Sequence, residues 1–366
     1  PAVATVGTGS IYSYNSGTAS ITTNGAVIGT NIGVLTTGSV TLQDNFNSTK
    51  QFRLEKGTFS TNAKSFSCSD FYSSYDPDTR ALTLTNSTVN ISGDVDLTPS
   101  ANLTVTTTGS TLNLTGNGKS YDLSNFTWGT INITGTSATL INSTTASTIA
   151  LSSTTTQAIT FTDGKTQTAT TFTLSGSAGH VHTLQGSSTA GWNLSKASGT
   201  VNADYISISR STAGGGATFN ANGASVNGGN NSGWNFPLTV TSQDASSVAM
   251  TAAGVTSGTF NGTLVDMGGS ASVDAYFVYG LTHSYGSGTT PVAKSAPATY
   301  TANIPANLTP GSTYYLEAIG VVGITFANGV EKSIAFTMPT VVTNSPTQSG
   351  SSLIFYGNVT AMGKAT

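Results

Sequence analysis

The three histidines of this chain are the first residues to consider as metal ligands. His180 and His182 alternate about Val181, so both could reach one ion, whereas His283 lies far along the chain. A zinc site usually needs three or four ligands, and no cysteine or carboxylate neighbours this pair. Because His182 stands two residues before Leu184, the spacing predicts instead an inward-facing, hydrogen-bonded histidine in a strand.

Two pairs of aspartates could serve as an acid and a base, or as calcium ligands. Asp94 and Asp96 are two residues apart, and so are Asp76 and Asp78. Residues at this spacing share one face of a strand, and glycan-cleaving β-helices need two close carboxylates or a base beside a cation. The simpler interpretation, which we favour, places these aspartates in turns at the corners of the fold.

No other constellation in the sequence points to catalysis or to a cofactor. The run Gly214-Gly215-Gly216 does not open a helix, as a phosphate-binding loop would, and no serine, histidine and acid lie in a recognisable motif. The net charge is −3 with 12 Lys and Arg, none clustered, which disfavours nucleic acid as a partner. We therefore expect no enzyme activity, no metal and no cofactor.

The surface must consist mainly of hydroxyl and amide groups. Charged residues make up 7% of the chain, against roughly 25% in an ordinary soluble domain. N-glycosylation acceptor sequences occur at Asn47, Asn86, Asn90, Asn102, Asn113, Asn125, Asn132, Asn142, Asn193, Asn230, Asn261, Asn307 and Asn358. Ser and Thr are so abundant that many of these arise by chance, but attached sugar would solubilise an almost uncharged surface.

The hydrophobic pattern predicts short strands and almost no helix. From about residue 81 to 208, apolar residues alternate in bursts such as Leu112 and Leu114 or Ile131 and Ile133, about every ten residues. A sandwich or a barrel would show hairpin signals and end after roughly 100 residues, whereas this pattern continues. We therefore predict a parallel β-helix with turns of roughly 20 to 30 residues.

The larger apolar side chains are expected in the core. We predict that the single cysteine, Cys68, is buried, and that Trp128, Trp192 and Trp234 pack in the core instead of stacking on carbohydrate. No apolar run approaches the ~18 residues that a membrane span requires. The chain opens at Pro1 without a leader-like segment, so we expect a mature form if the protein is exported.

Four segments between residues 159 and 236 have a similar residue pattern. They are ITFTDGK (159–165), FTLSGSAG (172–179), WNLSKASGTV (192–201) and GGNNSGWNF (228–236), and the most specific part is DYISIS (204–209) followed by GGGATF (214–219). This residue pattern resembles the right-handed β-helix repeats of large bacterial surface and adhesin-like proteins. The resemblance covers about residues 50 to 236. The resemblance implies a fold and a location at the cell surface, but no chemistry.

The residue pattern changes at Pro237, and residues 237–338 have the length of one sandwich domain. The segments VDAYFVYG (273–280) and LTPGSTYYLEA (308–318) resemble fibronectin type III-like domains of surface proteins. The resemblance places Tyr314 at the tyrosine-corner position, where its hydroxyl ties a strand end to the backbone. The predicted fold class is therefore all-β, with a parallel β-helix followed by an immunoglobulin or fibronectin III-like sandwich.

The two ends of the chain are expected to make contacts with other copies. The tail 339–366 reads as two strands, because SSLIFYGNVTAMG (351–363) echoes SGTFNGTLVDMG (257–268). An isolated hairpin is marginal in water, so Leu353, Phe355 and Val359 are candidate inter-subunit residues, unless a further sandwich follows. Residues 1–49 read as strands that form either the first turns, a cap, or a strand donated to a neighbour.

The leading interpretation is an extracellular or cell-surface structural protein, a subunit that assembles with itself into a filament, stalk or surface layer through head-to-tail β contacts. The alternative is a fragment of a large adhesin, in which the solenoid holds a distal binding domain away from the cell and glycans are partners. A carbohydrate-binding or carbohydrate-cleaving spike is a third possibility, but the chain offers few carboxylates for a groove.

Overall fold

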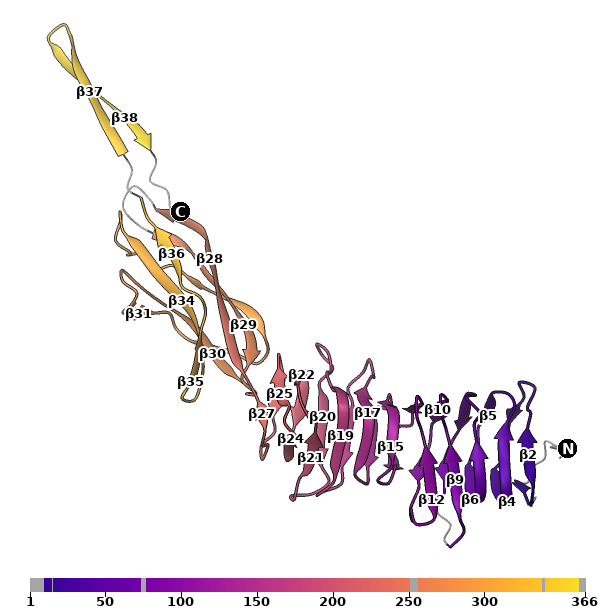
Figure 1. The fold of residues 1–366 in the computed structure, drawn as a ribbon. Coiled ribbons are helices and arrows are strands. Elements are labelled where there is room, and N and C mark those ends of the chain that lie inside the picture. The colour runs from indigo at the N-terminus through magenta and orange to yellow at the C-terminus, as the bar shows by residue number, and fades with distance from the viewer. Residues whose placement is uncertain (1–9, 15, 74–76, 251–255, 338–339, 362–366) are drawn as a thin grey trace. The chain divides into compact units, whose positions relative to one another are not determined.

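The computed structural model describes residues 10–14, 16–73, 77–250, 256–337 and 340–361, with the side chains of residues 340 and 359–361 excepted. All regular elements in these ranges are strands, and no helix occurs among them, which confirms the predicted fold class. The chain divides into two compact units, residues 1–236 and 237–366. Figure 1 shows the strands of both units along the chain.

The first unit is a parallel β-solenoid of about 10 turns. Its largest sheet contains β1 (Ile11–Ser13), β2 (Thr18–Ile21), β4 (Ile32–Leu42), β6 (Phe52–Ser60), β8 (Phe71–Tyr72), β9 (Arg80–Thr83), β11 (Val95–Asp96), β12 (Leu103–Thr106), β14 (Lys119–Asp122), β16 (Ser137–Leu140), β18 (Ala158–Phe161), β20 (His182–Gly186), β23 (Ile206–Ile208) and β26 (Val226–Asn227). Strands of successive turns lie side by side in this sheet (Figure 1).

Two further parallel sheets complete the solenoid. The second contains β3 (Val27–Ile28), β5 (Phe46–Ser48), β7 (Phe66–Cys68), β10 (Thr88–Ile91), β13 (Thr111–Leu114), β15 (Thr127–Ile133), β17 (Thr144–Leu151), β19 (Thr166–Thr173), β21 (Trp192–Ser195) and β24 (Ser211–Gly214). The third contains β22 (Thr200–Asp204), β25 (Thr218–Asn222) and β27 (Trp234–Asn235). The strands of residues 11–48 pair within the first two sheets, so the solenoid includes turns before residue 50.

Apolar side chains of equivalent positions stack in columns inside the solenoid. Leu112 on β13 pairs with Ile131 on β15, which pairs with Ile149 on β17, and all three are buried. Because side chains alternate between faces, one apolar residue in two is enough to fill the interior. Paired residues are between 15 (Phe219 and Trp234) and 27 (Thr166 and Asn193) positions apart, and most separations are close to the turn length that the sequence predicts.

Aromatic residues fill the wider parts of this core. Phe161 and Trp192 stack with ring centroids 3.7 Å apart. The residue that pairs with Phe161 on the next turn is Gly186, and a Cβ there would meet the Trp192 ring at 3.3 Å and the Asp163 carboxylate at 2.9 Å. The absence of a side chain at Gly186 therefore leaves space for the stacked indole.

The second unit begins with a β-sandwich of antiparallel sheets. One sheet contains β28 (Leu238–Met250), β29 (Thr256–Met267) and β33 (Ala298–Asn303). The other contains β30 (Val273–Gly280), β31 (Ser287–Gly288), β32 (Val292–Lys294), β34 (Thr313–Val322), β35 (Thr325–Asn328) and β36 (Lys332–Ala335). Phe260 from the first sheet and Phe277 from the second are wholly buried between the two sheets, and their ring centroids are 5.7 Å apart.

Tyr314, at the start of β34, makes the hydrogen bonds predicted for a tyrosine corner. Its hydroxyl oxygen accepts a hydrogen bond from the backbone N–H of Thr309 (3.0 Å) and lies 3.3 Å from the Thr309 hydroxyl. The ring is buried and packs edge-on against Phe336. The loop before β34 is thereby held to the strand that follows it.

The remaining two strands, β37 (Thr340–Ser349) and β38 (Ser352–Ala361), form an antiparallel hairpin. In the described part of the chain, these strands pair only with each other and form a separate two-stranded sheet. Every described side chain of both strands is exposed. The hairpin therefore has no buried face of its own.

Candidate functional site

The structure separates the histidines that the sequence offered as metal ligands. His182 is buried inside the solenoid, where its Nδ1 accepts a hydrogen bond from the backbone N–H of Gln157 (3.1 Å), whereas His180 is exposed. Burial, with a smaller effect of His180, lowers the pKa of His182 and keeps the ring neutral. The prediction of an inward, hydrogen-bonded histidine is confirmed. His283 belongs to the other unit.

The two aspartate pairs have different surroundings, and only Asp94 and Asp96 are seen to bind backbone groups. Asp94 Oδ1 accepts from the N–H of Ser120 (2.8 Å) on the next turn, and Asp96 Oδ1 accepts from the N–H of Thr98 (2.9 Å). Asp78 forms an ion pair with Lys56 (2.9 Å), and Asp76 lies outside the described residues. Among the described residues, no group of three or more His, Cys, Asp or Glu side chains is placed to hold a metal ion.

Carboxylates elsewhere fasten one solenoid turn to another. Asp44 accepts hydrogen bonds from the N–H groups of Thr23 (2.9 Å) and Asn24 (2.6 Å), and Asp163 accepts from those of Ser188 and Ala190 (3.0 Å each). These bonds lower the pKa of both carboxyls, with the Thr23 N–H contributing most at Asp44 and the Ser188 hydroxyl most at Asp163. The carboxylates therefore stabilise turns, and their partners leave them poorly suited to catalysis.

The predictions for cysteine and tryptophan are largely confirmed. Cys68 is buried, and burial, with a smaller contribution from Asp70, raises the pKa of its thiol. Trp128 and Trp192 are core residues. Trp234 is only partly buried: it packs on the core, 5.3 Å from the Phe219 ring, and its indole N–H donates to the Ser211 hydroxyl. The rings of Trp128 and Trp192 are therefore enclosed in the core, where carbohydrate cannot stack on them.

Three of the glycosylation sequences form a hydrogen-bonded ladder on the outer face of the second sheet. Nδ2 of Asn132 donates to Oδ1 of Asn113 (3.2 Å), and Nδ2 of Asn113 donates to Oδ1 of Asn90 (2.8 Å). The ladder ends at the hydroxyls of Ser67 and Ser152. A glycan attaches to Nδ2, the same atom that donates in the ladder. Glycosylation at these three positions would therefore have to use the second Nδ2 hydrogen and fit a sugar beside half-buried neighbours on the adjacent turns.

The thirteen acceptor sequences fall into two groups. Half-buried asparagines, each donating a hydrogen bond through Nδ2, are Asn90, Asn113, Asn132, Asn142, Asn193 and Asn261. Exposed ones are Asn47, Asn86, Asn102, Asn125, Asn230, Asn307 and Asn358. The exposed group provides the accessible acceptor positions.

Sequence reasoning missed the ladder, although a signal for it is present. Each ladder asparagine lies between two apolar residues, in the triplets VNI (89–91), LNL (112–114) and INI (131–133). The triplets WNL (192–194), VNA (201–203) and FNA (219–221) follow the same pattern, and Asn202, Asn220 and Asn235 form a second ladder on the third sheet. An asparagine flanked by inward apolar residues at the turn spacing marks such a column.

Among the described elements, the hairpin carries the largest number of exposed large apolar side chains. Leu353 is 56% and Phe355 75% exposed on one face of β38, and Val341 on the same face is 59% exposed. The third candidate residue, Val359, pairs with Val341, but its side chain lies outside the described set. The opposite face also carries exposed apolar side chains, including Tyr356. Exposed apolar side chains gathered on one element in this way are typical of interaction surfaces.

The hairpin repeats the sequence of two strands that are buried in the sandwich. Phe260, Gly262 and Leu264 on β29 recur as Phe355, Gly357 and Val359 on β38, and the sequence Met-Gly follows three residues after Leu264 and after Val359. Likewise, the segment PLTVT (237–241) that starts β28 recurs as PTVVT (339–343) at β37. Phe260 and Leu264 are wholly buried under the facing sheet. The hairpin thus has the sequence of strands whose apolar side chains need a facing sheet.

The solenoid has open strand edges at its ends. Within the described residues, the first two sheets begin at β1, β2 and β3, and the three sheets end at β26, β24 and β27. Each of these strands pairs with one other strand, and the outer edge of β24 is also bridged to Ser232. Tyr14 and Val27, near the first strands, are 70% and 51% exposed. Unpaired backbone groups of this kind can accept a further strand.

Comparison with known proteins gives no match: no family model fits the chain, and no curated protein or solved structure is significantly similar to it. In the part of the chain that the structure describes, no helix has the length and apolar character needed to cross a membrane.

Proposed function

We propose that this chain is a structural protein of the extracellular space or cell surface, and that copies of it assemble through their β-strands. The observation that carries the proposal is the exposed hairpin β37–β38, whose counterpart β28–β29 is part of a closed sandwich. The solenoid supports it, because stacked turns give an extended scaffold that ends in unpaired edges. The low content of charged residues in the whole chain, 7%, suits a surface coated with sugar.

The sandwich is best assigned to the fibronectin type III-like class. Its sheets, β28-β29-β33 and β31-β30-β34-β35 with β32 and β36, have a strand order that fits this class, and Tyr314 provides the corner. The hairpin then corresponds to the first two strands of a second such domain. A neighbouring copy would complete it by supplying strands that cover Leu353 and Phe355.

Burial of the hairpin would contribute substantial free energy to assembly. Fully burying a Leu or Phe side chain contributes about 1.5–3 kcal/mol. Removing Phe355, which is 75% exposed, should therefore raise the concentration needed for assembly by roughly 10- to 150-fold. The exposed sandwich residue Val330, at 79%, provides a matched control outside the hairpin.

The test combines electron microscopy of the purified full chain with sedimentation velocity over a range of concentrations. We expect regular assemblies whose contacts include residues 340–361, weakened in Phe355→Ser and unchanged in Val330→Ser. A chain that stays monomeric at all concentrations would exclude self-assembly. Isolated monomers extending into further sandwich domains would instead support the alternative, a cell-surface adhesin in which this segment is a spacer.

The proposed modification sites are the exposed asparagines, not the ladder asparagines. If the source organism N-glycosylates, we expect sugar at positions such as Asn47, Asn125 and Asn307, whose side chains are exposed. Peptide mapping of the native protein by mass spectrometry would test this assignment. Sugar on Asn113 would contradict it.

A further inference from the structure

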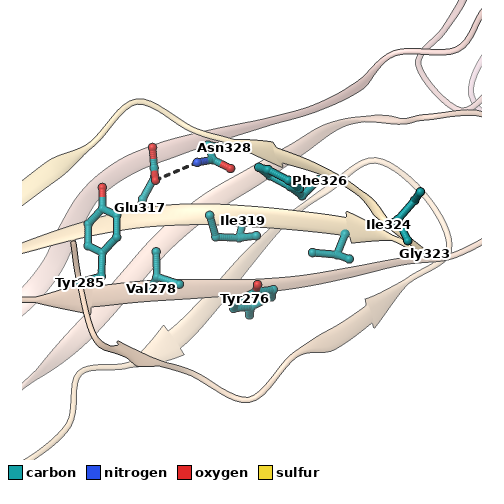
Figure 2. Close-up of a pocket in the computed structure, with 10 residues that line it drawn as sticks. Tyr276, Val278, Tyr285, Glu317, Ile319, Gly323, Ile324, Phe326 and Asn328 are labelled. Carbon is teal, nitrogen blue, oxygen red and sulfur yellow. Dashed lines mark hydrogen bonds between the residues drawn. The ribbon is translucent and has the colours of Figure 1, made fainter. Parts of the chain in front are cut away.

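A groove of about 340 Å³ lies on the outer face of the six-stranded sheet of the sandwich. Figure 2 shows its lining, with Tyr276 on β30, Ile319 on β34 and Phe326 on β35. Tyr276 pairs with Ile319, and Ile319 pairs with Asn328, so the floor crosses three neighbouring strands. The sandwich core lies on the other face of this sheet. The groove is therefore separate from the packing that holds the two sheets together.

Aromatic and aliphatic side chains make the walls of this groove. Phe326 is 69% exposed and the neighbouring Ile324 is 99% exposed, which is costly for side chains of this size. Tyr276 and Tyr285 line the groove with half-buried rings. Rings of this kind offer flat apolar faces with a polar edge, which can receive the C–H face of a sugar ring.

Two polar side chains converge on the same groove. Nδ2 of Asn328 donates a hydrogen bond to Oε2 of Glu317 (3.2 Å), as the dashed line in Figure 2 marks. This bond leaves the other carboxylate oxygen and the amide oxygen as acceptors, and one amide hydrogen as a donor. Acceptors and a donor placed side by side match the neighbouring hydroxyl groups of a saccharide.

Tyr285 is held in place by groups behind it. Its hydroxyl donates to Oε2 of Glu331 (2.8 Å), and Oε1 of Glu331 lies 2.8 Å from Nδ1 of His283. The His283 ring in turn packs on Tyr315 at 4.2 Å. Burial and the hydrogen bond to Glu331 raise the pKa of Tyr285, so the phenol stays protonated and keeps donating. A fixed ring of this kind costs little entropy when a ligand binds.

The charge of the groove restricts the ligand. Glu317 lines it, Glu331 lies behind Tyr285, and Asp274 is on the outward face of β30. Among the described residues that line the groove, none is Lys or Arg. Phosphorylated, sulfated or uronic saccharides would be repelled by these carboxylates.

We propose that this groove binds a neutral saccharide, with Phe326 and Tyr276 contacting the sugar faces and Glu317 and Asn328 binding its hydroxyl groups. The groove spans more than one strand and is open along its length, which suits a segment of an oligosaccharide. This inference does not depend on self-assembly, because the groove and the hairpin β37–β38 share no residue.

The test is isothermal titration of the full chain with cellohexaose, xylohexaose, maltohexaose and chitohexaose, and with a glycoprotein that bears a high-mannose glycan. The free oligosaccharides represent polysaccharides, and the glycoprotein represents glycans carried on a protein. Phe326→Ala and Glu317→Gln should each weaken binding about tenfold or more, since each removes a ring face or a charged acceptor. Phe355→Ala, an equally exposed aromatic on the hairpin, should leave binding unchanged.

Three results would overturn the proposal. They are the absence of binding to every saccharide in the panel, binding that survives both groove variants, and stronger binding to an oligogalacturonate than to neutral sugars. Titration with tetramethylammonium and with an apolar peptide identifies the competing ligand classes, and preferential binding of either would replace the saccharide. Sedimentation of the same variants keeps the outcome separate from assembly, because Phe326→Ala leaves the hairpin intact.

Discussion

Replacing Asn113 by alanine tests whether the asparagine ladder stabilises the solenoid. Asn113 is the middle member: its Nδ2 donates to Asn90 (2.8 Å) and its Oδ1 accepts from Asn132 (3.2 Å). The substitution removes both bonds, and each is worth about 0.5–1.5 kcal/mol net. Because these side chains are only half-buried, water can replace part of what is lost, so we expect a loss of about 1–2 kcal/mol.

Amide hydrogen exchange of the full chain is the assay, because urea unfolding alone would mix the two units. Protection should fall most in residues 111–114 and in the paired strands 88–91 and 127–133, since solenoid turns couple mainly to their neighbours. The sandwich, residues 238–336, should exchange as in the parent chain. The change in the opening free energy of these amides gives the size of the loss.

Asn47→Ala is the matched control. Asn47 lies in the same outer column, since it pairs with Ser67, which pairs with Asn90. It is exposed, and no side-chain hydrogen bond is formed by it within the described residues. Its replacement should change stability by less than about 0.5 kcal/mol. Equal effects of the two substitutions, or a negligible effect of Asn113→Ala, would refute the reasoning.

Two further predictions concern single hydrogen-bonding groups. Tyr314→Phe keeps the buried ring but removes the partner of the Thr309 N–H. The free energy of unfolding of the sandwich, measured with urea, should therefore fall by about 1–2 kcal/mol. An unchanged midpoint would contradict the tyrosine corner. The pKa of Asp163 is lowered in the folded chain. The stability that its carboxylate contributes is therefore complete above the ordinary pKa of about 4, and it is lost as the pH falls through the lowered pKa. The difference in unfolding midpoint between the parent chain and Asp163→Asn should therefore be present at pH 7 and shrink toward pH 3; a pH-independent difference would exclude this role.

Local pattern predicted the class of each element well. Alternation such as Leu112 and Leu114 indicates a strand with one inward face, and both residues are buried. The inward orientation of His182 follows from the same alternation, whereas the burial of Cys68 was predicted from the usual behaviour of a lone cysteine. The hydroxyl bond of Tyr314, in contrast, was predicted from the resemblance of residues 308–318 to fibronectin type III-like domains. These features depend on neighbours in sequence, and so a single chain contains the information for them.

The candidate sites were predicted less completely. The hairpin was recognised because Phe355, Gly357 and Val359 repeat Phe260, Gly262 and Leu264 within the chain. The groove was not, because Glu317 and Asn328 are neighbours only through the pairing of β34 with β35, and Tyr276 joins them from β30. Asn113 was read as a glycosylation acceptor, although its amide is used by the residues 23 positions before it and 19 positions after it.

The sequence by itself determined that the chain forms strands, which side of each strand faces inward, and where the texture of one unit changes to that of the next at Pro237. These follow from side-chain alternation, which is a local property of an extended backbone. Only the tertiary structure decided which strands are neighbours, and hence that Asn90, Asn113 and Asn132 form one column and that the indole of Trp192 lies over Phe161 beside Gly186. Register between turns is set by the length of each corner and by the packing of the whole core. Turns that vary between 15 and 27 residues have no fixed period from which the register could be predicted.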